Sequence, residues 1–466
     1  AVMALVGGVA ALVAARPLAD NSFLTHLATG RLILDQGVPS ENPFLFTGTS
    51  FPVPSWWWSV LLGLADDLGG ASAIRLVTAV VAGLVGVSLV RLTRPGVDEL
   101  ERRPDVSMSL LSAVVPAVLA LVCVMLFLSG RPHLAGYLLL ALALVVWNEQ
   151  RSPWWLVPIF ACWVNVHGSW LYGVAVLVLF GVARAIDDRR LRARDGWNVL
   201  AAIGGVVVGG ALYPRAFEIV LLPTRQFGDP IEREALEAYQ EWSRVPFDQP
   251  ILYALLALGG VALLGAVRTR RWAAAGAVVA LVIMGWSGSR LVPVAAVSLV
   301  PFAAMAMRDI GTLGLPTGRA ARASLVAGAL LAVATVGYSF STESYDLEKY
   351  PVAAVDWLEQ RDLIADDARV VSHDYVGNFL EWRFGDRANA YVDDRPDAAT
   401  LLQYQRLLTV EDGWRDDLDE IDAPVVLWKA DGDLADELAE DPDWVDAVEL
   451  DDYRVFCRAD IADRCR

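Results

Sequence analysis

The sequence lacks the short motifs that mark several large classes of enzymes. It has no phosphate-binding glycine loop, no dinucleotide fingerprint, no zinc-ligand spacing and no serine-nucleophile motif. These absences argue against chemistry on soluble nucleotides. The chain also has no internal repeat, whereas many transporters are built from repeated halves. The lack of repeats therefore counts against a transporter.

Cysteine is scarce, with four residues in a chain of 466. Cys123 and Cys162 lie in apolar runs, where we expect them to be small buried hydrophobic side chains. Cys457 and Cys465 lie near the end of the sequence and have no metal-ligand spacing around them. Their spacing leaves a disulfide open, which forms if this region faces an oxidising compartment.

Positive charge falls far short of negative charge in the last quarter of the chain. Residues 342–466 contain 34 acidic and 13 basic residues, whereas the rest of the chain contains 21 acidic and 25 basic residues. The sequence thus predicts a slightly basic body (1–341) and an acidic soluble domain (342–466). Because such a domain repels phosphate, its charge argues against nucleic acid as a partner. The acidic surface leaves open a protein partner that binds to it.

Apolar residues dominate the body of the chain. Hydrophobic residues make up 55% of the sequence, and the mean hydropathy is +0.43. We therefore predict a polytopic α-helical membrane protein with about 11 transmembrane helices, several of them short and hence tilted, broken or re-entrant. The apolar runs cover residues 1–15, 71–90, 107–129, 136–148, 153–165, 168–186, 197–213, 249–267, 272–287, 290–307 and 323–341.

Three further expectations concern the first run and two segments that lie between runs. The run 1–15 is followed by Arg16-Pro17 rather than by a small-residue cleavage site, so we expect a retained first span. The Trp-rich segment 54–70 is expected to form a helix at the membrane interface. Residues 226–250 are expected to form an amphipathic interfacial helix, with Glu241 and Trp242 near its end.

Arginine placement predicts the orientation, because basic connections face the cytoplasm. The basic connections are residues 91–94, 184–195, 268–271 and 308–322. The remaining connections, 16–55, 130–134, 165–168, 214–248 and 287–290, then face outward together with the C-terminal domain. The expected location is a bacterial plasma membrane, crossed many times, with an extracytoplasmic C-terminal domain.

The C-terminal domain has the pattern of an α/β domain. Apolar periodicity predicts helices over 351–360, 377–384 and 397–408. Short apolar segments rich in β-branched or aromatic residues predict strands over 368–373, 388–393, 423–430, 445–450 and 453–458.

Polar side chains gather on the connections that we expect to face outward. Asp20 and His26 lie in the first loop, and Arg131, His133, Asn165, His167 and Arg290 lie at helix ends. Ionisable groups near a bilayer are costly and often functional, so together these residues predict one polar cavity that opens outward. Blander explanations exist: a lone cation often extends to the interface, Asn165 and His167 could satisfy a helix break, and Asp20 could cap a helix.

Such a cavity suits a substrate with a phosphate head and a lipid tail. Arg131, His133 and Arg290 would bind the phosphate, since guanidinium groups bind phosphate in a bidentate manner. Asp20 would act as general base on an acceptor hydroxyl that attacks the anomeric carbon of a sugar, with His26 beside it.

The first loop follows a recognisable pattern formed by Asp20, His26, Gly30, Asn42-Pro43-Phe44 and Thr47, with Pro39 between them. Further matches are "RPHLAGYLL", "WVNVHGSWLYG", "ALYPRAFEI", "EWSRVPF", "SRLVPVAAVSLVPFAA" and "DYVGNFLEWRF…AYVDDRPD". In these residues the chain resembles the GT-C superfamily of membrane glycosyltransferases, which includes protein O-mannosyltransferases and oligosaccharyltransferases. It looks closest to a poorly characterised bacterial branch, and the resemblance covers nearly the whole chain.

The resemblance implies a GT-C-like fold of many transmembrane helices with an outer soluble domain. It implies that Asp20 is the catalytic carboxylate and that the donor is a polyprenyl-phosphate-linked sugar. Many members carry a second acidic residue in the first loop, but here Asn21 follows Asp20. Glu41 is then either the second acid or a loop cap, no metal ligands are assigned, and a divalent cation is left open.

The C-terminal motif "YVDDRPD" adds Asp394 and Arg395, which either contact the acceptor or form an ion pair in a solvated turn. His373 and Asp374 are open to both kinds of explanation. The expected function is an inverting glycosyltransferase that acts in contact with membrane lipid on a cell-envelope glycan, lipid or protein. The alternatives are a transporter of lipid-linked sugar and a non-catalytic membrane subunit.

Overall fold

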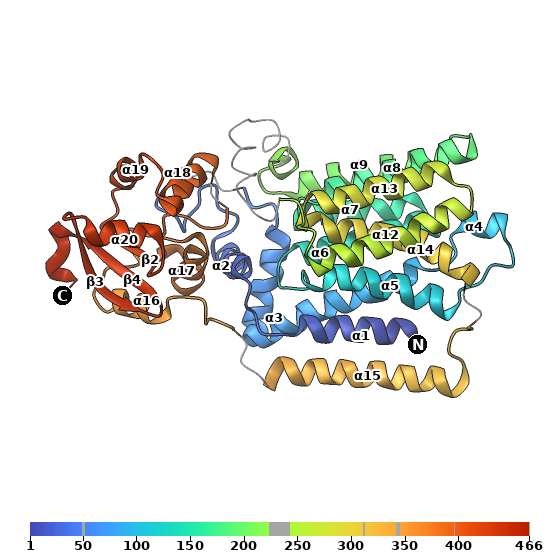
Figure 1. Ribbon diagram of the computed structural model, residues 1–466, viewed down its shortest axis with the longest axis horizontal. Coiled ribbons are helices and arrows are strands. Elements are labelled where there is room, and N and C mark those ends of the chain that lie inside the picture. Colours follow the sequence, from blue (N-terminus) through green and yellow to red (C-terminus); the bar gives the residue numbers. More distant parts are fainter. Residues whose placement is uncertain (49–51, 223–242, 311–312, 342–344, 396, 466) are drawn as a thin grey trace. The chain divides into compact units, whose positions relative to one another are not determined.

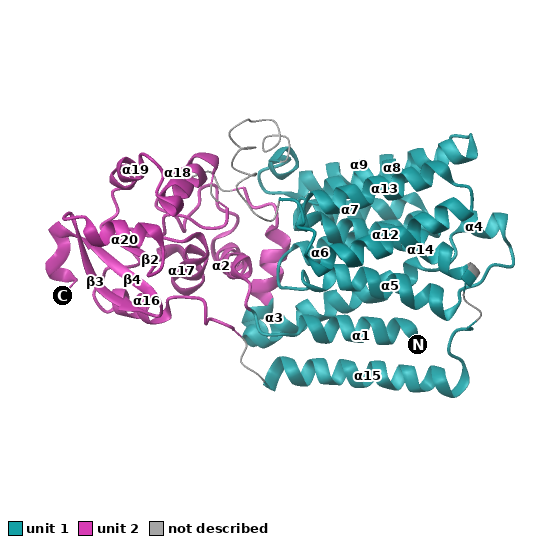
Figure 2. Cartoon of the chain, viewed as in Figure 1, with its two compact units in different colours: residues 1–18, 65–223, 239–344 teal, residues 19–64, 224–238, 345–466 magenta. Residues whose placement is uncertain are grey.

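The computed structural model describes residues 1–48, 52–222, 243–310, 313–341, 345–395 and 397–465. The chain forms two compact units (Figure 2). Unit 1 comprises residues 1–18, 65–223 and 239–344, and unit 2 comprises residues 19–64, 224–238 and 345–466. The first loop thus belongs to the same unit as the acidic C-terminal region. The helix expected over 226–250 falls largely outside the described residues, as do Glu241 and Trp242.

Unit 1 is helical (Figure 1). Its helices are α1 (Val2–Ala14), most of α3 (Trp56–Leu92), α4 (Val97–Arg102), α5 (Leu110–Met125), α6 (His133–Asn148), α7 (Leu156–Val166), α8 (Trp170–Asp188), α9 (Ala193–Leu212), α12 (Pro250–Arg268), α13 (Trp272–Ser287), α14 (Val292–Ile310) and α15 (Gly318–Ser341). Among the described residues, six helical stretches are long and apolar enough to cross a membrane, and five apolar helices are shorter. This is the architecture of a helical membrane protein.

Helix α3 is interrupted near its first third. Gly69 and Gly70 have non-helical backbone angles, and Gly70 has φ 60°, a conformation that favours glycine. The interruption falls at the boundary that the sequence predicted between the Trp-rich segment 54–70 and the apolar run 71–90. A glycine pair is one of the recognised causes of a sharp helix kink.

A network of buried ion pairs joins several basic connections at one end of unit 1. Arg184 lies between the carboxylates of Asp98 and Asp195, at 2.8 and 2.9 Å. Arg192 contacts Asp98 at 2.5 Å and Asp188 at 2.7 Å. The network ties α4 to the end of α8 and the start of α9. Arg308 in α14 extends it through a buried ion pair with Glu99 of α4.

A fully buried arginine joins two other helix ends. The Arg75 guanidinium donates to the carbonyl oxygens of Ala15 at 2.8 Å and of Ser339 and Tyr338 at 3.1 Å. These carbonyls belong to the C-terminal ends of α1 and α15, where helical hydrogen bonding leaves oxygens without an intrahelical donor. The two helix dipoles place about half a negative charge each beside the cation, so they offset much of the cost of burying it.

Unit 2 contains α2 (Asn21–Gln36), the start of α3 and a C-terminal α/β region. The sheet has the order β1-β2-β4-β3, with β1 parallel to β2 and the other pairs antiparallel. Its strands are β1 (Val370–Ser372), β2 (Val425–Lys429), β3 (Trp444–Leu450) and β4 (Tyr453–Arg458). Its helices are α16 (Val352–Glu359), α17 (Asp374–Phe384), α18 (Ala398–Thr409), α19 (Trp414–Ile421) and α20 (Asp433–Glu440).

The predicted elements of this region are confirmed except one. The strand expected over 388–393 is wrong, because only Ala390 pairs, with Val370 on one side and Leu45 of the first loop on the other. Asn389 has a left-handed φ of 46°, which interrupts an extended strand. The short helices α19 and α20 were not predicted, since each has few apolar residues among many acidic ones.

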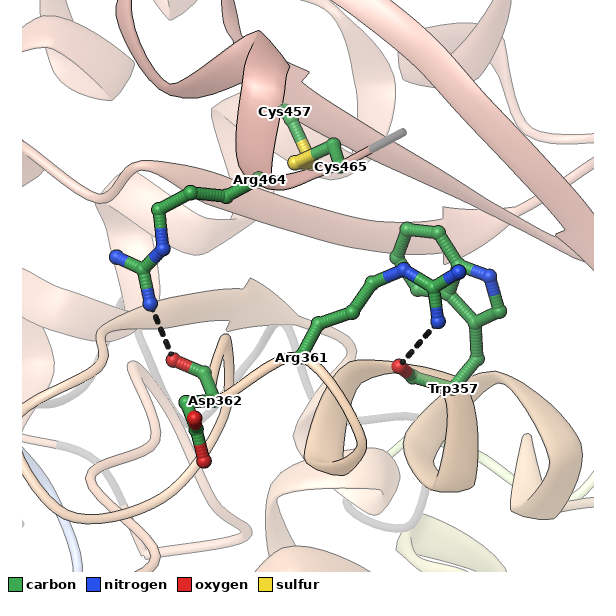
Figure 3. Close-up of a disulfide and its surroundings, with 6 residues drawn as sticks. All are labelled: Trp357, Arg361, Asp362, Cys457, Arg464 and Cys465. Carbon is green, nitrogen blue, oxygen red and sulfur yellow. Dashed lines mark hydrogen bonds between the residues drawn. A yellow bond between two sulfur atoms is a disulfide. The ribbon is translucent and has the colours of Figure 1, made fainter.

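Cys457 in β4 and Cys465 form a disulfide (Figure 3). The bridge closes the turn of 3-10 helix over Ala459–Arg464, and Arg464 donates a hydrogen bond to the Asp362 carbonyl oxygen at 2.8 Å. The disulfide that the sequence left open is therefore present.

We predict that Gly30→Ala destabilises unit 2 by about 3 kcal/mol or more, because the added methyl group would lie 1.9 Å from the Ser59 carbonyl oxygen. Gly204→Ala in α9 is the matched control, since a methyl group there meets open space. It should raise stability by about 0.5–1 kcal/mol. Thermal unfolding of the purified protein measures both effects, and equal midpoints for the two variants would contradict the prediction.

Candidate functional site

Asp20 occupies the N-cap position of α2. Its backbone is extended (φ −84°, ψ 129°), as an N-cap requires, but within the described part of the chain its carboxylate does not accept the capping hydrogen bond. The capping explanation for Asp20 is therefore not supported. The helix itself begins directly after Asp20, at Asn21.

One face of α2 packs on the start of α3. His26 and Gly30 are four residues apart and share this face. His26 Nδ1 lies 3.3 Å from the Ser59 hydroxyl, and Gly30 approaches the backbone of Ser59 and Gly63. His26 is partly buried there, whereas Glu41 in the following loop is exposed.

The adjacent face of α2 packs on α17. The Thr25 hydroxyl donates to Asn378 Oδ1 at 2.7 Å, and the Thr29 hydroxyl accepts from Arg395 Nη1 at 2.9 Å. Both threonines and Asn378 are fully buried. The two threonines are four residues apart, so they form a second stripe about 100° around the helix axis from His26 and Gly30.

The loop after α2 also joins the C-terminal region. Ala390 N donates to the Phe44 carbonyl oxygen at 2.9 Å, and Phe46 N donates to the Ala390 carbonyl oxygen at 3.1 Å. The Asn42 side chain accepts from Phe44 N at 3.0 Å and reaches Asp393 at 3.5 Å. The motif Asn42-Pro43-Phe44 therefore has a structural explanation, because it leads into an extended segment that pairs with Ala390, which in turn pairs with Val370 of β1.

Arg395 lies at the centre of a buried charged group, called here the Arg395 cluster and formed by Thr29, Glu381, Asp393 and Arg395. Arg395 Nη2 contacts Glu381 at 2.9 Å and Asp393 at 2.8 Å, and its Nε contacts Asp393 at 3.1 Å. Both carboxyl groups are fully buried, whereas the Arg395 side chain is 22% exposed.

The two carboxyl groups of the cluster differ in protonation. Burial raises the pKa of Glu381 well above its usual range. Burial also opposes ionisation of Asp393, but the Arg395 guanidinium and a hydrogen bond from Glu381 outweigh it and hold the pKa of Asp393 low. These opposite shifts favour the protonated form of Glu381 beside an ionised Asp393, which pairs with Arg395.

Asp394 and Arg395, predicted to bind substrate, are therefore built into unit 2. Arg395 directs its guanidinium into the cluster. Asp394 N donates to Asn378 Oδ1 at 3.1 Å, and its carboxylate lies 3.9 Å from Arg395 Nε. The alternative explanation, an ion pair in a solvated turn, holds in part: Arg395 does pair with aspartate, but its main partners Glu381 and Asp393 are buried.

In unit 1 two of the predicted histidines lie together. The ring centroids of His133, at the start of α6, and His167, directly after α7, are 6.4 Å apart. His133 Nε2 donates to the Phe127 carbonyl oxygen at 2.8 Å, which fixes its tautomer because a carbonyl can only accept. Arg131 precedes His133 by two residues, and Arg290 is exposed on the short turn Ser289–Leu291.

The sequence reasoning missed the side chains that orient His167. Ser169 N donates to His167 Nδ1 at 3.1 Å, so this nitrogen is the acceptor and the neutral ring carries its proton on Nε2. The Ser169 hydroxyl lies 2.8 Å from the same nitrogen and accepts from Trp163 Nε1 at 3.0 Å. The only sequence signal for Ser169 was its position two residues after His167, in the segment "HGS".

Asn165 has a packing role. It is fully buried, and its Nδ2 donates to the carbonyl oxygens of Ala161 and Gly209 at 2.9 Å, which joins α7 to α9. The structure thus brings His133 and His167 together but directs Asn165 into the helix packing.

His373 and Asp374 lie in an aromatic group at the start of α17. His373 stacks on Trp428 with ring centroids 4.0 Å apart, and burial lowers its pKa to about 4. Asp374 lies 3.4 Å from the Tyr404 hydroxyl, and burial, reinforced by the nearby Asp394 carboxylate, raises its pKa to about 6.

Within the described residues, no three His, Cys, Asp or Glu side chains form a group that could hold a metal ion. No protein-family model matches the chain, and no curated protein matches it. The resemblance to GT-C glycosyltransferases therefore stays a prediction carried by the motifs of this sequence.

The protonation of the Arg395 cluster gives a test by substitution. Glu381→Gln should change the free energy of unfolding by no more than about 1 kcal/mol, because glutamine replaces a neutral carboxyl. Asp393→Asn should cost about 3–5 kcal/mol, because it leaves Arg395 without its buried counter-charge. Chemical denaturation measures both. The assignment is wrong if Glu381→Gln is the more damaging change.

His373 and Asp374 should affect acid stability in opposite directions. The pKa of His373 is lower in the folded state, so stability is lost as the pH falls from about 6.5 to 4. The pKa of Asp374 is higher in the folded state, so the stability that its protonated form provides at low pH is lost as the pH rises from about 3.8 to 6. Asp374→Asn should therefore make the loss of stability on acidification steeper than in the wild type, as measured by unfolding at several pH values. An unchanged slope would contradict this prediction.

Proposed function

We propose that this chain is an integral-membrane glycosyltransferase that transfers a sugar from a polyprenyl-phosphate donor to a cell-envelope acceptor. The observation that carries the proposal is the state of Asp20, an N-cap carboxylate that does not make the capping hydrogen bond. Its helix also carries His26, which lies beside Ser59. A carboxylate at the start of a helix that also carries a histidine suits proton abstraction.

The proposed reaction is a single displacement. The acceptor hydroxyl oxygen forms a bond to the anomeric carbon while the bond from that carbon to the phosphate oxygen breaks, so the configuration inverts. Asp20 takes the hydroxyl proton, with His26 assisting, and the polyprenyl phosphate leaves with the electron pair. Arg131, His133 and Arg290 are the proposed phosphate ligands, and His167, whose ring lies beside that of His133, is proposed to bind substrate at the same place.

The proposal includes eleven spans, the six long helical stretches and the five shorter apolar helices, in a bacterial plasma membrane. The basic connections would face the cytoplasm, and the C-terminal region would face outward. The exposed Trp154, Trp197 and Trp272 lie at the same helix ends as these basic connections, which suits a membrane interface.

A specific observation disfavours the alternative of a transporter. Alternating access would require helix ends to separate, but the Asp98, Arg184, Arg192 and Asp195 side chains tie α4, α8 and α9 by buried ion pairs. Breaking one buried pair by removing a partner costs about 3–5 kcal/mol. An enzyme that works without separating these ends fits the network better.

Asp20→Asn should lower turnover by about 10²–10⁴-fold, because it removes the general base while it keeps the shape of the side chain. Asp35→Asn is the matched control, since Asp35 lies on the exposed side of the same helix. The assay is transfer from a short-chain polyprenyl-phosphate sugar to envelope fractions by the purified protein.

Thermal unfolding should show that both variants remain folded. Equal turnover by Asp20→Asn and Asp35→Asn would remove Asp20 from the mechanism. A stoichiometric partner that copurifies, with no turnover by this chain alone, would favour the non-catalytic subunit.

A further inference from the structure

The Arg395 cluster does more than stabilise the C-terminal region, because one of its members belongs to the first loop. Thr29 lies on α2, whereas Glu381 lies on α17, and Asp393 and Arg395 lie in the segment after Ala390. The hydrogen bond from Arg395 Nη1 to the Thr29 hydroxyl is 2.9 Å long and joins residues 366 positions apart in the sequence. The cluster thus couples the helix of Asp20 and His26 to the sheet region.

The geometry suits control of helix rotation. Thr29 lies three residues after His26 and one residue before Gly30, on the face adjacent to theirs. Packing of Gly30 on Ser59 allows close approach, but a glycine contact has no directional bond. The Arg395–Thr29 bond, with the Thr25–Asn378 bond one turn earlier, supplies that direction.

The guanidinium is itself held in place. Four hydrogen bonds join its Nε and Nη2 atoms to the Glu381 and Asp393 carboxyl groups, which are fully buried. Arg395 N also donates to Asp393 at 2.6 Å, and the Phe44 ring lies 5.9 Å from the guanidinium carbon. Such a planar, fully bound group has one orientation, so Nη1 reaches Thr29 from a fixed direction.

We propose that Arg395 is a positioning residue of the transfer reaction, which sets the rotation of α2 through Thr29 and so orients Asp20 and His26. The inference rests on the proposed function. Arg395 then orients the proposed base Asp20 instead of binding substrate. The C-terminal region thereby becomes part of the catalytic machinery. Misplacement of a catalytic group by about 1 Å costs on the order of 10²-fold in rate, so a lost bond at this point is measurable.

Substitutions at Thr29 separate orientation from packing. Thr29→Val keeps the volume and removes the hydroxyl, and Thr29→Ser keeps the hydroxyl and removes the methyl group. We expect Thr29→Val to lower kcat at least tenfold, with the affinity for short-chain polyprenyl phosphate unchanged within twofold. Thr29→Ser should retain at least half of the wild-type kcat. The reverse order, with Thr29→Ser the slower variant, would show a packing role and overturn the inference.

Arg383 provides a matched control for Arg395. It lies on α17, pairs with Asp356 at 2.6 Å and with Glu359, and its side chain is 23% exposed, against 22% for Arg395. Arg395→Lys should lower kcat at least tenfold, because one ammonium group cannot make the contacts of three nitrogens. Arg383→Lys should leave kcat within twofold. Equal effects of the two lysine variants would overturn the inference.

Hydrogen exchange of the full chain gives a readout that does not depend on turnover. Thr29→Val should speed exchange of the amides of α2 at least tenfold and leave those of β2 and β4 unchanged. Unchanged exchange in α2 would overturn the inference even if kcat falls. If Asp20→Asn keeps full turnover, the proposed function fails, whereas the exchange of α2 still decides whether Arg395 orients this helix.

Discussion

Buried charge must be compensated, and this constraint governs how both units are built. In unit 2 the guanidinium of Arg395 meets two fully buried carboxyl groups, and burial raises the pKa of one of them, Glu381, well above its usual range. In unit 1 the buried Arg75 meets carbonyl oxygens at the ends of α1 and α15. Because an uncompensated charge costs several kcal/mol in a region of low dielectric constant, each of these groups fixes the segments that supply its partners.

The same constraint explains why the first loop belongs to the C-terminal region. Thr29, Asn42 and Phe44 come from the first 50 residues, yet all three contact the segment around Ala390 to Arg395. Removing the first loop would leave Arg395 without its hydroxyl partner and the Ala390 backbone without its bonds to residues 44–46. The two segments therefore form one folding unit despite their separation in sequence.

Much of the fold could be predicted from the sequence because its signals are local. The apolar runs and the tail periodicity depend on neighbouring residues, and the segment expected over 54–70 ends where helix α3 is interrupted, at Gly69 and Gly70. The strand expected over 388–393 failed for a non-local reason, since Ala390 pairs with a first-loop residue on one side. Short helices such as α20 are fixed by a few apolar contacts, which a sequence rich in Asp and Glu conceals.

The site was less predictable, because polar residue types do not reveal their partners. Asn165 and Arg395 have the chemistry of ligand-binding residues, but their donors meet carbonyl and carboxylate groups of the protein itself. His167 lies beside His133, but its tautomer depends on Ser169, whose contact with His167 the segment "WVNVHGSWLYG" did not reveal. Sequence patterns thus indicated candidate segments. Distances were needed to separate residues proposed to bind substrate from residues whose polar groups hold other parts of the protein in place.

The distinction between substrate-binding and positioning residues limits which side chains of each unit can take part in the proposed reaction. In unit 2, Thr25, Thr29 and Asn378 orient α2, which leaves the base chemistry of the proposed reaction to Asp20 and His26. In unit 1, His133 donates through Nε2 to a carbonyl oxygen, and His167 accepts through Nδ1 from a backbone amide. Both neutral rings therefore carry their proton on Nε2.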